Sequence, residues 1–269
     1  MNPEIPGDTT EIDEICKRVR AQISPDLELP DAQWTLQSGP FKSVQHFFDS
    51  SFQNFKELLY FTGLTPQHRV LDYGCGLGRI SIPMSAYLDP VSGSYCGVDT
   101  NASCISRNSR VFNDYENFSF QHANIYSKMY NRQGKGMKEL LKHDLGEPFD
   151  LAFLFSVFTH ILSSDCDFLL KYLRSQLTGS GEIFTSWFLI NEETQEAIDA
   201  GQSDRKFLHK HGDARIDNKE VPEGAVAYNE QDVLDRFAKA GFSDVQVHYG
   251  MWRGCIKSWV YQDIIIARA

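Results

Sequence analysis

A strand, a glycine-rich turn and the start of a helix are all predicted within ten residues, VLDYGCGLGR at positions 70–79. The predicted strand ends in an acidic residue, Asp72, and the turn follows directly. Glycine adopts the positive φ angles of such a turn and lets the backbone pass close to a ligand. A ligand at this turn would lie at the carboxyl edge of the strand, which is the usual crevice of an open α/β sheet.

The rest of the chain repeats this alternation of short apolar runs and helical stretches. The strand candidates are 68–74, 94–99, 118–123, 149–155 and 181–189. Strands that alternate with helices predict an α/β fold with a doubly wound, mostly parallel sheet. The run LAFLF at 151–155 is apolar throughout, as in a central strand buried on both faces. Two further candidates, 243–249 and 259–269, have no helix between them, which predicts an antiparallel pair at one edge.

The alternation starts near Arg69 and is interrupted twice, which suggests a division of the 269 residues. Residues 1–68 are predicted to form an acidic tail and an N-terminal helical extension or cap, because apolar residues recur at helical spacing over 41–64. Residues 69–269 are predicted to form the main domain. Its two polar stretches, near 127–148 and 191–228, are expected to be insertions, and insertions of this length are often lids or flexible loops.

Composition restricts the class of protein. The formal net charge is −10, which disfavours a nucleic-acid partner because the phosphate backbone would be repelled. No apolar run approaches the roughly 18–20 residues of a membrane-spanning helix. The acidic N-terminus lacks the pattern of a signal peptide, so we expect a soluble, cytoplasmic protein. The six cysteines include no CxxC pair and do not suggest a disulfide framework.

Two cofactor classes compete for the glycine turn. A dinucleotide fold requires GxGxxG, which places pyrophosphate on the helix N-terminus. Here the spacing is GxGxG, and Arg79 stands where the third glycine would be. Asp72 would also place a negative charge near a pyrophosphate, whereas it suits a ligand that carries an ammonium and a sulfonium. A turn that only links strand to helix is the remaining alternative.

From about Arg69 to Ala267 the sequence resembles the class I S-adenosylmethionine (SAM)-dependent methyltransferases. The segment LDYGCGLGR is similar to the first motif of that family. The resemblance implies a Rossmann-like, seven-stranded, mostly parallel sheet with an antiparallel C-terminal strand. It also implies SAM as the cofactor and S-adenosylhomocysteine (SAH) as the product.

The same resemblance implies the residues of the cofactor site. Asp99 falls where the family places the acid that accepts hydrogen bonds from the ribose hydroxyls, although an acid there also suits NAD. Asn124 matches the position that contacts the adenine amino group, and Phe155 and Ser156 should lie beneath the sulfonium. The full set of implied cofactor contacts is Asp72, Gly74, Cys75, Gly76, Gly78, Asp99, Thr100, Asn124, Ile125, Phe155 and Ser156.

Methyl transfer to a neutral hydroxyl benefits from a general base. His160 is the candidate, because it follows the fourth predicted strand closely and histidine titrates near working pH. A structural role at the start of the next helix is the competing interpretation. His46, His122, His209 and His211 have weaker positional arguments. Ser156 stands where metal-dependent O-methyltransferases usually carry an Asp, so no metal is expected.

The acceptor is suggested only by fainter signals. Trp252-Arg253-Gly254 followed by Gln262-Asp263, together with Ser38-Gly39 upstream, resembles bacterial methyltransferases linked to polysaccharide, glycolipid or secondary-metabolite synthesis. This resemblance favours O-methylation of a sugar hydroxyl. In the second insertion, the basic residues Arg205, Lys206, Lys210 and Arg215 could neutralise a phosphate or carboxylate on the acceptor, or could simply be solvated.

Other functions stay open at this point. The aromatic residues Trp34, Phe47, Phe48, Phe52 and Tyr60 could cap the acceptor pocket or form core. N- or O-methylation of a small secondary metabolite is the second enzyme hypothesis. A non-catalytic SAM-binding protein and an NAD(P)-dependent oxidoreductase are the other two classes, the last disfavoured by the glycine spacing. The expected partner in each methyltransferase hypothesis is a small molecule.

Overall fold

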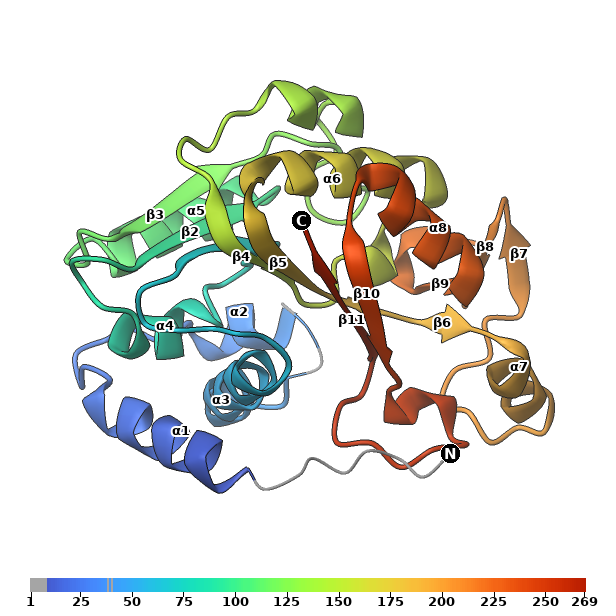
Figure 1. The fold of residues 1–269 in the computed structure, drawn as a ribbon, viewed down its shortest axis with the longest axis horizontal. Helices are drawn as coiled ribbons and strands as arrows, with labels where there is room; N and C mark the ends of the chain where they lie inside the picture. The colour runs from blue at the N-terminus through green and yellow to red at the C-terminus, as the bar shows by residue number, and fades with distance from the viewer. Residues whose placement is uncertain (1–8, 38, 40) are drawn as a thin grey trace. The chain divides into compact units, whose positions relative to one another are not determined.

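The computed structural model describes residues 9–37, 39 and 41–269 (Figure 1). The first eight residues of the predicted tail and Ser38 of the fainter motif lie outside this description. The chain divides into two compact units. The described residues 9–134 and 149–153 form one, which we call the turn unit. Residues 135–148 and 154–269 form the other, which we call the insertion unit. The predicted boundary between an N-terminal extension, residues 1–68, and the main domain, residues 69–269, stays a prediction.

The turn unit carries the N-terminal helices and the strands around the glycine turn. In chain order its elements are α1 (Thr10–Gln22), α2 (Ala32–Gln37), α3 (Val44–Phe61), β1 (Arg69–Tyr73), α4 (Ser81–Tyr87), β2 (Ser94–Asp99), α5 (Ala102–Val111) and β3 (Phe118–His122), with β4 (Phe149–Leu154) starting in this unit. Each predicted strand from 68 to 155 is present within two residues of its expected limits.

The insertion unit holds the remaining elements. They are the short 3-10 helices η1 (Met137–Lys142), η2 (Phe158–His160), η3 (Pro222–Gly224) and η4 (Met251–Arg253), the helices α6 (Ser163–Gln176), α7 (Glu192–Asp199) and α8 (Glu230–Ala240), and the strands β5 (Leu177–Trp187), β6 (Leu189–Ile190), β7 (His209–His211), β8 (Ala214–Ile216), β9 (Val226–Asn229), β10 (Ser243–His248) and β11 (Asp263–Arg268).

The main sheet has seven strands in the order β10-β11-β5-β4-β1-β2-β3. Strand β1 pairs in parallel with β2 and β4, and β2 pairs in parallel with β3. Strand β11 runs antiparallel to both β5 and β10. The predicted Rossmann-like sheet and its closing antiparallel pair are therefore confirmed. In the turn unit this order places the carboxyl ends of β1, β2 and β3 next to one another.

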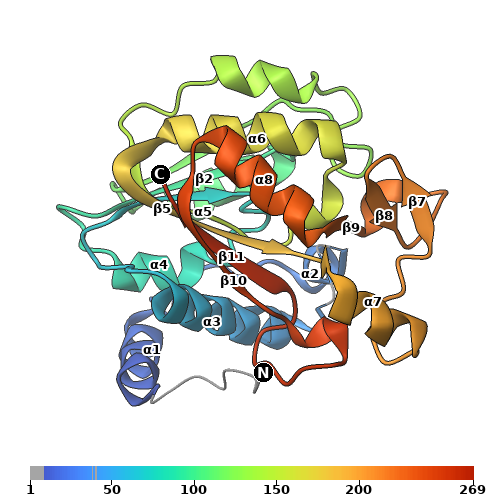
Figure 2. The ribbon, with the colours of Figure 1, turned by 45° about the vertical axis from the view of Figure 1, so that its right-hand side comes forward.

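The stretch 191–228 contains regular secondary structure where a lid or flexible loop was expected. Strands β6, β9, β8 and β7 form a second, four-stranded sheet in that order, with α7 beside it (Figure 2). Ala214 and Ile216 on β8 are buried, and Arg215 between them is exposed. The short strands and their charged outward residues explain why the apolar alternation was missed.

Helix α3 confirms the helical periodicity predicted over 41–64. It begins after Ser43, whose side chain accepts a hydrogen bond from the backbone N–H of His46 at 3.0 Å. Phe47, Phe52 and Phe55 are buried, and α3 packs against α1 and α4. Phe47 and Phe52 of the aromatic set therefore belong to the core, whereas Phe48 and Tyr60 are half-buried. Trp34 on α2 is more exposed, at 36%.

Two further observations concern the class of protein. All six cysteines are free thiols. In the part of the chain that the structure describes, every helix is too short or too polar to cross a membrane.

Candidate functional site

The glycine turn after β1 depends on backbone conformations that other residues rarely adopt. Gly74, Gly76 and Gly78 have φ angles of +89°, +51° and +76°. The N–H of Gly74 donates to the carbonyl of Val98 on β2 at 2.7 Å. A Cβ on Gly78 would lie 2.9 Å from the Asn108 side chain, whereas one on Gly76 would meet no atom within 4 Å. The turn is thus tied to β2 and leaves open space beside Gly76.

Asp99 at the end of β2 is bonded directly to this turn. Its Oδ2 accepts from the N–H of Gly76 at 2.8 Å, and its Oδ1 accepts from the N–H of Asn101 at 2.7 Å. Burial raises the pKa of Asp99, and the surrounding backbone N–H groups act in the opposite direction. The backbone N–H of Thr100 is a third donor to this carboxylate. A carboxylate has about four acceptor sites, so Asp99 can still accept a hydrogen bond from a hydroxyl group.

Asp72 on β1 is almost completely buried, at 3% exposure. The hydroxyl of Tyr95 donates to its Oδ2 at 2.5 Å, and Ser81 donates in turn to the Tyr95 hydroxyl at 2.9 Å. Burial raises the pKa of Asp72 to about 7, although the Tyr95 hydrogen bond and the Arg79 charge both lower it. A cationic ligand group beside Asp72 would favour its ionised form, because opposite charges stabilise each other.

Arg79 occupies the position that a dinucleotide fold reserves for glycine, and its side chain is turned toward α3. The guanidinium donates a hydrogen bond to Asn54 on α3 and lies 5.3 Å from the centre of the Phe41 ring. The Arg79 charge also interacts with the buried carboxyl of Glu57, whose pKa is raised to about 7 by burial. Arg79 thus links the turn to an N-terminal helix, a role that its place in the sequence did not indicate.

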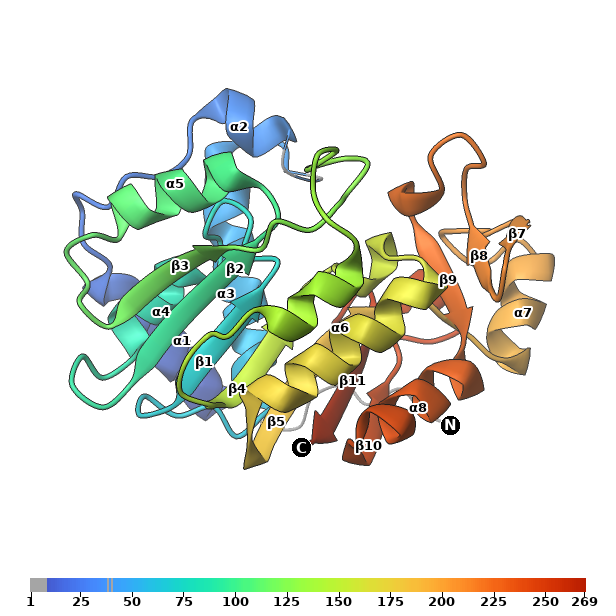
Figure 3. The same ribbon diagram turned by 90° about the horizontal axis from the view of Figure 1, so that it is seen from above.

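Asn108 is a residue that the sequence reasoning missed. It is fully buried on α5, which runs beside β2 and β3 (Figure 3). Its side-chain N–H donates to the carbonyl of Gly76 at 2.8 Å and so supports the turn from behind. The sequence did contain a signal for this role. Asn108 is a polar residue that stands four positions after Cys104 and three after Ile105, and therefore lies on the same, buried side of the helix.

The predicted adenine contacts follow β3. The N–H of Ala123 donates to the carbonyl of Asp99 at 3.0 Å, which brings Asn124 and Ile125 next to the end of β2. Asn124 is exposed, and its oxygen accepts from the side chain of Asn131 at 3.0 Å. Ile125 is buried, at 4% exposure. The structure therefore brings together every implied cofactor residue that belongs to the turn unit.

Cys75 and Thr100 complete that group. Burial raises the pKa of the Cys75 thiol well above its usual value, so the thiol stays protonated. The carbonyl of Thr100 lies 3.1 Å from Nε2 of His122, which is exposed on β3.

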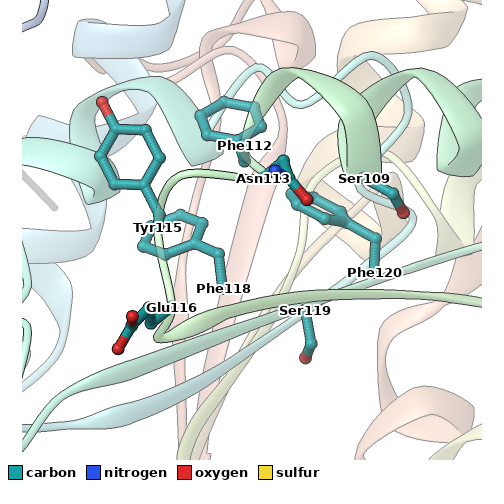
Figure 4. Close-up of a pocket in the computed structure, with 8 residues that line it drawn as sticks. All are labelled: Ser109, Phe112, Asn113, Tyr115, Glu116, Phe118, Ser119 and Phe120. Atoms are coloured by element: carbon teal, nitrogen blue, oxygen red, sulfur yellow. The ribbon is translucent and has the colours of Figure 1, made fainter.

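Two surface grooves of the turn unit are lined by other residues. One, of about 310 Å³, lies beside β3, where the ring of Phe118 stacks on Phe112 and lies tilted against Tyr115 (Figure 4). The second, of about 670 Å³, lies between residues 28–34 and α5, where Arg110 is paired with Glu28 at 2.6 Å. Neither groove contains a residue that the sequence assigned to the cofactor.

In the insertion unit, β4 ends at Leu154 and is followed by Phe155 and Ser156. Ser156 has a φ angle of +58°. Its backbone N–H donates to the Ser186 hydroxyl at 2.7 Å, and its own hydroxyl donates to Gln262 at 3.0 Å. Phe155 packs against Phe184, with 4.8 Å between ring centres. A non-glycine residue held in this conformation costs roughly 1–3 kcal/mol, and such strain concentrates at functional sites.

His160 lies at the end of η2 in the insertion unit. Its Nδ1 is 2.8 Å from the carbonyl oxygen of Glu223. A carbonyl only accepts, so Nδ1 carries the proton and the neutral ring keeps a lone pair on Nε2. Burial lowers the pKa of His160, the Glu223 hydrogen bond raises it, and the Arg205 charge lowers it. The imidazole is thus held in the neutral form and the tautomer that a general base requires.

The other histidines lie elsewhere. His46 lies in the first turn of α3, where its Nδ1 accepts from the N–H of Lys42 at 3.1 Å. His209 and His211 lie on β7, opposite Ile216 and Ala214 of β8. Within residues 9–37, 39 and 41–269, no three His, Cys, Asp or Glu side chains gather as ligands for a metal ion. Metal independence stays a prediction.

The Trp-Arg-Gly and Gln-Asp motif forms part of the interior of the insertion unit. Asp263 is fully buried and accepts four hydrogen bonds, each of 2.8 Å. Two come from the side chains of Trp252 and Arg253, and two from the backbone N–H groups of Leu189 and Gly250. Most residues of the motif therefore have a structural role in the interior of the insertion unit. Gln262 differs, because its side chain accepts a hydrogen bond from the Ser156 hydroxyl.

This network predicts a large effect on stability. We expect Asp263→Ala to lower the free energy of unfolding by about 3–5 kcal/mol, because it leaves the buried Arg253 charge without its closest acidic partner. Urea unfolding followed by circular dichroism measures this loss. Lys142→Ala, which removes an exposed ion pair to Glu139, is the control and should leave the unfolding midpoint unchanged. Equal midpoints for wild type and Asp263→Ala would contradict the role of the network.

Comparison with known proteins gives a family match over most of the chain. A family model described as "Methyltransferase domain" matches residues 15–247. Three solved structures share the fold at low sequence identity. A candidate O-methyltransferase from Nostoc punctiforme PCC 73102 is 18% identical, with a TM-score of 0.56 over 97% of this chain and 68% of that one.

The other two are a SAM-dependent methyltransferase from Archaeoglobus fulgidus and the magnesium protoporphyrin IX methyltransferase ChlM from Synechocystis PCC 6803, solved with bound SAH. The first is 14% identical, with a TM-score of 0.52 over 83% of this chain and 94% of that one. The second is 16% identical, with a TM-score of 0.51 over 88% of this chain and 92% of that one. At these identities the likeness concerns the fold.

Proposed function

The chain belongs to the methyltransferase-domain family and is a SAM-dependent methyltransferase, and from this premise we propose that it methylates a hydroxyl group of a sugar or glycan precursor without a metal ion. The observation that carries the hydroxyl assignment is the hydrogen bond from His160 Nδ1 to the Glu223 carbonyl. It leaves Nε2 as a proton acceptor, which a neutral hydroxyl nucleophile needs and a neutral amine does not.

The residues of the glycine turn are suited to the cofactor. A Cβ on Gly76 would enter the open space beside the turn, and we propose that Asp99 next to this space accepts hydrogen bonds from the ribose of the cofactor. We propose that Asp72 favours the positive charge of the methionine part and that Asn124 contacts the adenine. The backbone of the turn, with Cys75, would lie against the methionine part. When bound, SAM supplies an electrophilic methyl group on a sulfonium.

Asp99→Ala tests the ribose assignment. We expect the Kd of SAM and of SAH to rise at least tenfold, because a hydrogen bond to a charged group contributes about 1.5–3 kcal/mol. Isothermal titration calorimetry measures both constants. Asp114→Ala removes an exposed acid beyond the end of α5 and serves as the control for net charge. An unchanged Kd in Asp99→Ala would refute the assignment.

The role proposed for His160 follows from its tautomer. A hydroxyl of the acceptor would donate to Nε2, and its proton would pass to that nitrogen as the acceptor oxygen bonds to the methyl carbon and the sulfur–methyl bond breaks, with SAH as the leaving group. The backbone carbonyl of Glu223, which accepts from Nδ1, would then stabilise the imidazolium, since both ring nitrogens are donors in the charged form. The main task of the remaining residues would be to orient the acceptor and exclude water.

The first test is SAH release from SAM over a panel of sugars, glycolipid precursors and small amines, with and without EDTA. Turnover on a hydroxyl acceptor that is insensitive to EDTA is the expected result. Turnover on amines alone would contradict the proposed acceptor. Loss of turnover in EDTA that is restored by Mg²⁺ would contradict metal independence.

A further inference from the structure

We propose that Arg205 binds an oxyanion of the acceptor, a carboxylate or a phosphate, and so makes this enzyme selective for acidic or phosphorylated sugars. The inference rests on the proposed function, because it assigns a specificity residue to the acceptor side of the same site. It concerns only the insertion unit.

The Arg205 side chain is held in a defined position. Its guanidinium lies over the ring of Phe188, 5.2 Å from the ring centre. Its Nη1 donates to Asp217 at 2.6 Å, and a second hydrogen bond joins it to Tyr261. A guanidinium that is already ordered loses little conformational entropy when it binds a planar oxyanion.

The hydrogen-bonding capacity of Arg205 is only partly used. A guanidinium has five N–H donors, and two side chains, Asp217 and Tyr261, accept from this one. Its Nε is buried, with no hydrogen-bond partner among the described residues. The side chain as a whole is 37% exposed, so part of the guanidinium still reaches solvent. The donors that an oxyanion can reach are therefore the unused N–H groups on the exposed part of the guanidinium.

The backbone next to Arg205 is strained in a way that supports this position. Phe207 has a φ angle of +44° although it is not glycine, and its ring is fully buried. The N–H of Phe207 donates to the second oxygen of Asp217 at 3.1 Å. One carboxylate therefore holds both the Arg205 guanidinium and the strained turn. Such conformations persist where the surrounding structure stabilises them, and they concentrate at ligand-binding sites.

Arg205 is electrostatically coupled to His160. Its positive charge is one of the causes that lower the pKa of His160, after burial. The two residues are also connected through η3, since the His160 ring is bonded to the Glu223 carbonyl and η3 packs against η2. An acceptor that places a hydroxyl at His160 Nε2 could thus extend an oxyanion toward Arg205.

The other cations of the insertion differ from Arg205. Lys206, Lys210 and Arg215 are exposed, and among the described residues none of them makes an ion pair. Lys210 lies directly opposite Arg215 on the β7–β8 hairpin. These exposed cations would bind an anion weakly, and they provide matched controls for charge.

The experiment measures sugar binding to the SAH-saturated protein by isothermal titration calorimetry. The probes are glucuronate, glucose 6-phosphate and glucose, and the proteins are wild type, Arg205→Gln, Arg205→Lys and Lys210→Gln. We expect wild type to bind at least one anionic probe ten times more tightly than glucose. Whichever anion is preferred identifies the oxyanion as carboxylate or phosphate.

Arg205→Gln should lose at least tenfold in affinity for that anion, Arg205→Lys should recover part of it, and Lys210→Gln should stay within twofold of wild type. The Kd of SAH and the Tm should not change in Arg205→Gln. Equal binding of glucose and the anions, or equal losses in Arg205→Gln and Lys210→Gln, would overturn the proposal.

The turnover assay separates the two proposals. Oxyanion binding that depends on Arg205, without methylation of any hydroxyl, would support the Arg205 site and contradict O-methylation. EDTA-insensitive methylation of neutral sugars, unaffected by Arg205→Gln, would support O-methylation and overturn the Arg205 site.

Discussion

His160→Gln is expected to lower kcat by about 10²–10⁴-fold, the range typical of removing a general base. Glutamine can still donate to the Glu223 carbonyl through its amide, but it has no basic nitrogen to take a proton from the acceptor hydroxyl. The Kd of SAM should stay within twofold of wild type. Steady-state kinetics on the acceptor found in the panel, together with calorimetry for SAM, measure both quantities.

The pH dependence gives an independent test of the same residue. Burial lowers the pKa of His160 below its usual value near 6.5, so the ring is neutral at pH 7. Only the neutral ring can accept a proton, and kcat/KM should therefore fall as the pH drops below about 6.5 and stay level above pH 7. His160→Gln should lose this dependence.

His211→Gln is the matched control, because His211 is exposed on β7 in the same insertion. Its rate and pH profile should equal those of wild type. A His160→Gln enzyme with the wild-type rate and profile would place the base elsewhere.

Gly76→Val is expected to weaken SAH binding at least 100-fold while the protein stays folded. The φ angle of +51° strongly disfavours a β-branched residue, and the new side chain would enter the open space beside Asp99. None of the described residues occupies that space, so the cost to folding is limited to the backbone strain, roughly 1–2 kcal/mol. Calorimetry with SAH and the Tm measure the two effects separately.

Gly179→Val provides the control. Gly179 lies on β5, where its Cβ would also meet no atom and where no positive φ is required. Valine suits a strand, so SAH binding and Tm should both be retained. Normal SAH binding by Gly76→Val would show that the turn does not hold the cofactor.

The main sheet and the glycine turn were predictable because their signals are local. Strands β1, β2 and β4 are short apolar runs separated by helical stretches, and such runs are buried in a parallel sheet wherever they occur. The turn conformation follows from Gly74, Gly76 and Gly78, since few other residues adopt positive φ angles. The antiparallel β10–β11 pair follows from the absence of a crossover α-helix between the two strands, where only the three-residue 3-10 helix η4 lies.

The small sheet of the insertion was harder to predict. Its strands have two to four residues, and among them only β8 alternates buried apolar residues with an exposed charge, so no periodic pattern was long enough to recognise.

The sequence by itself therefore determined the fold class, the order of strands along the chain and the family. Only the tertiary structure decided which polar side chains meet. Asn108 supports Gly76 across 32 residues, Arg79 reaches back 25 residues to Asn54, and His160 is held in its tautomer by a carbonyl 63 residues away. The physical reason is that periodicity and turn chemistry depend on neighbours in the chain, whereas buried polar groups must find partners wherever the packed fold brings them.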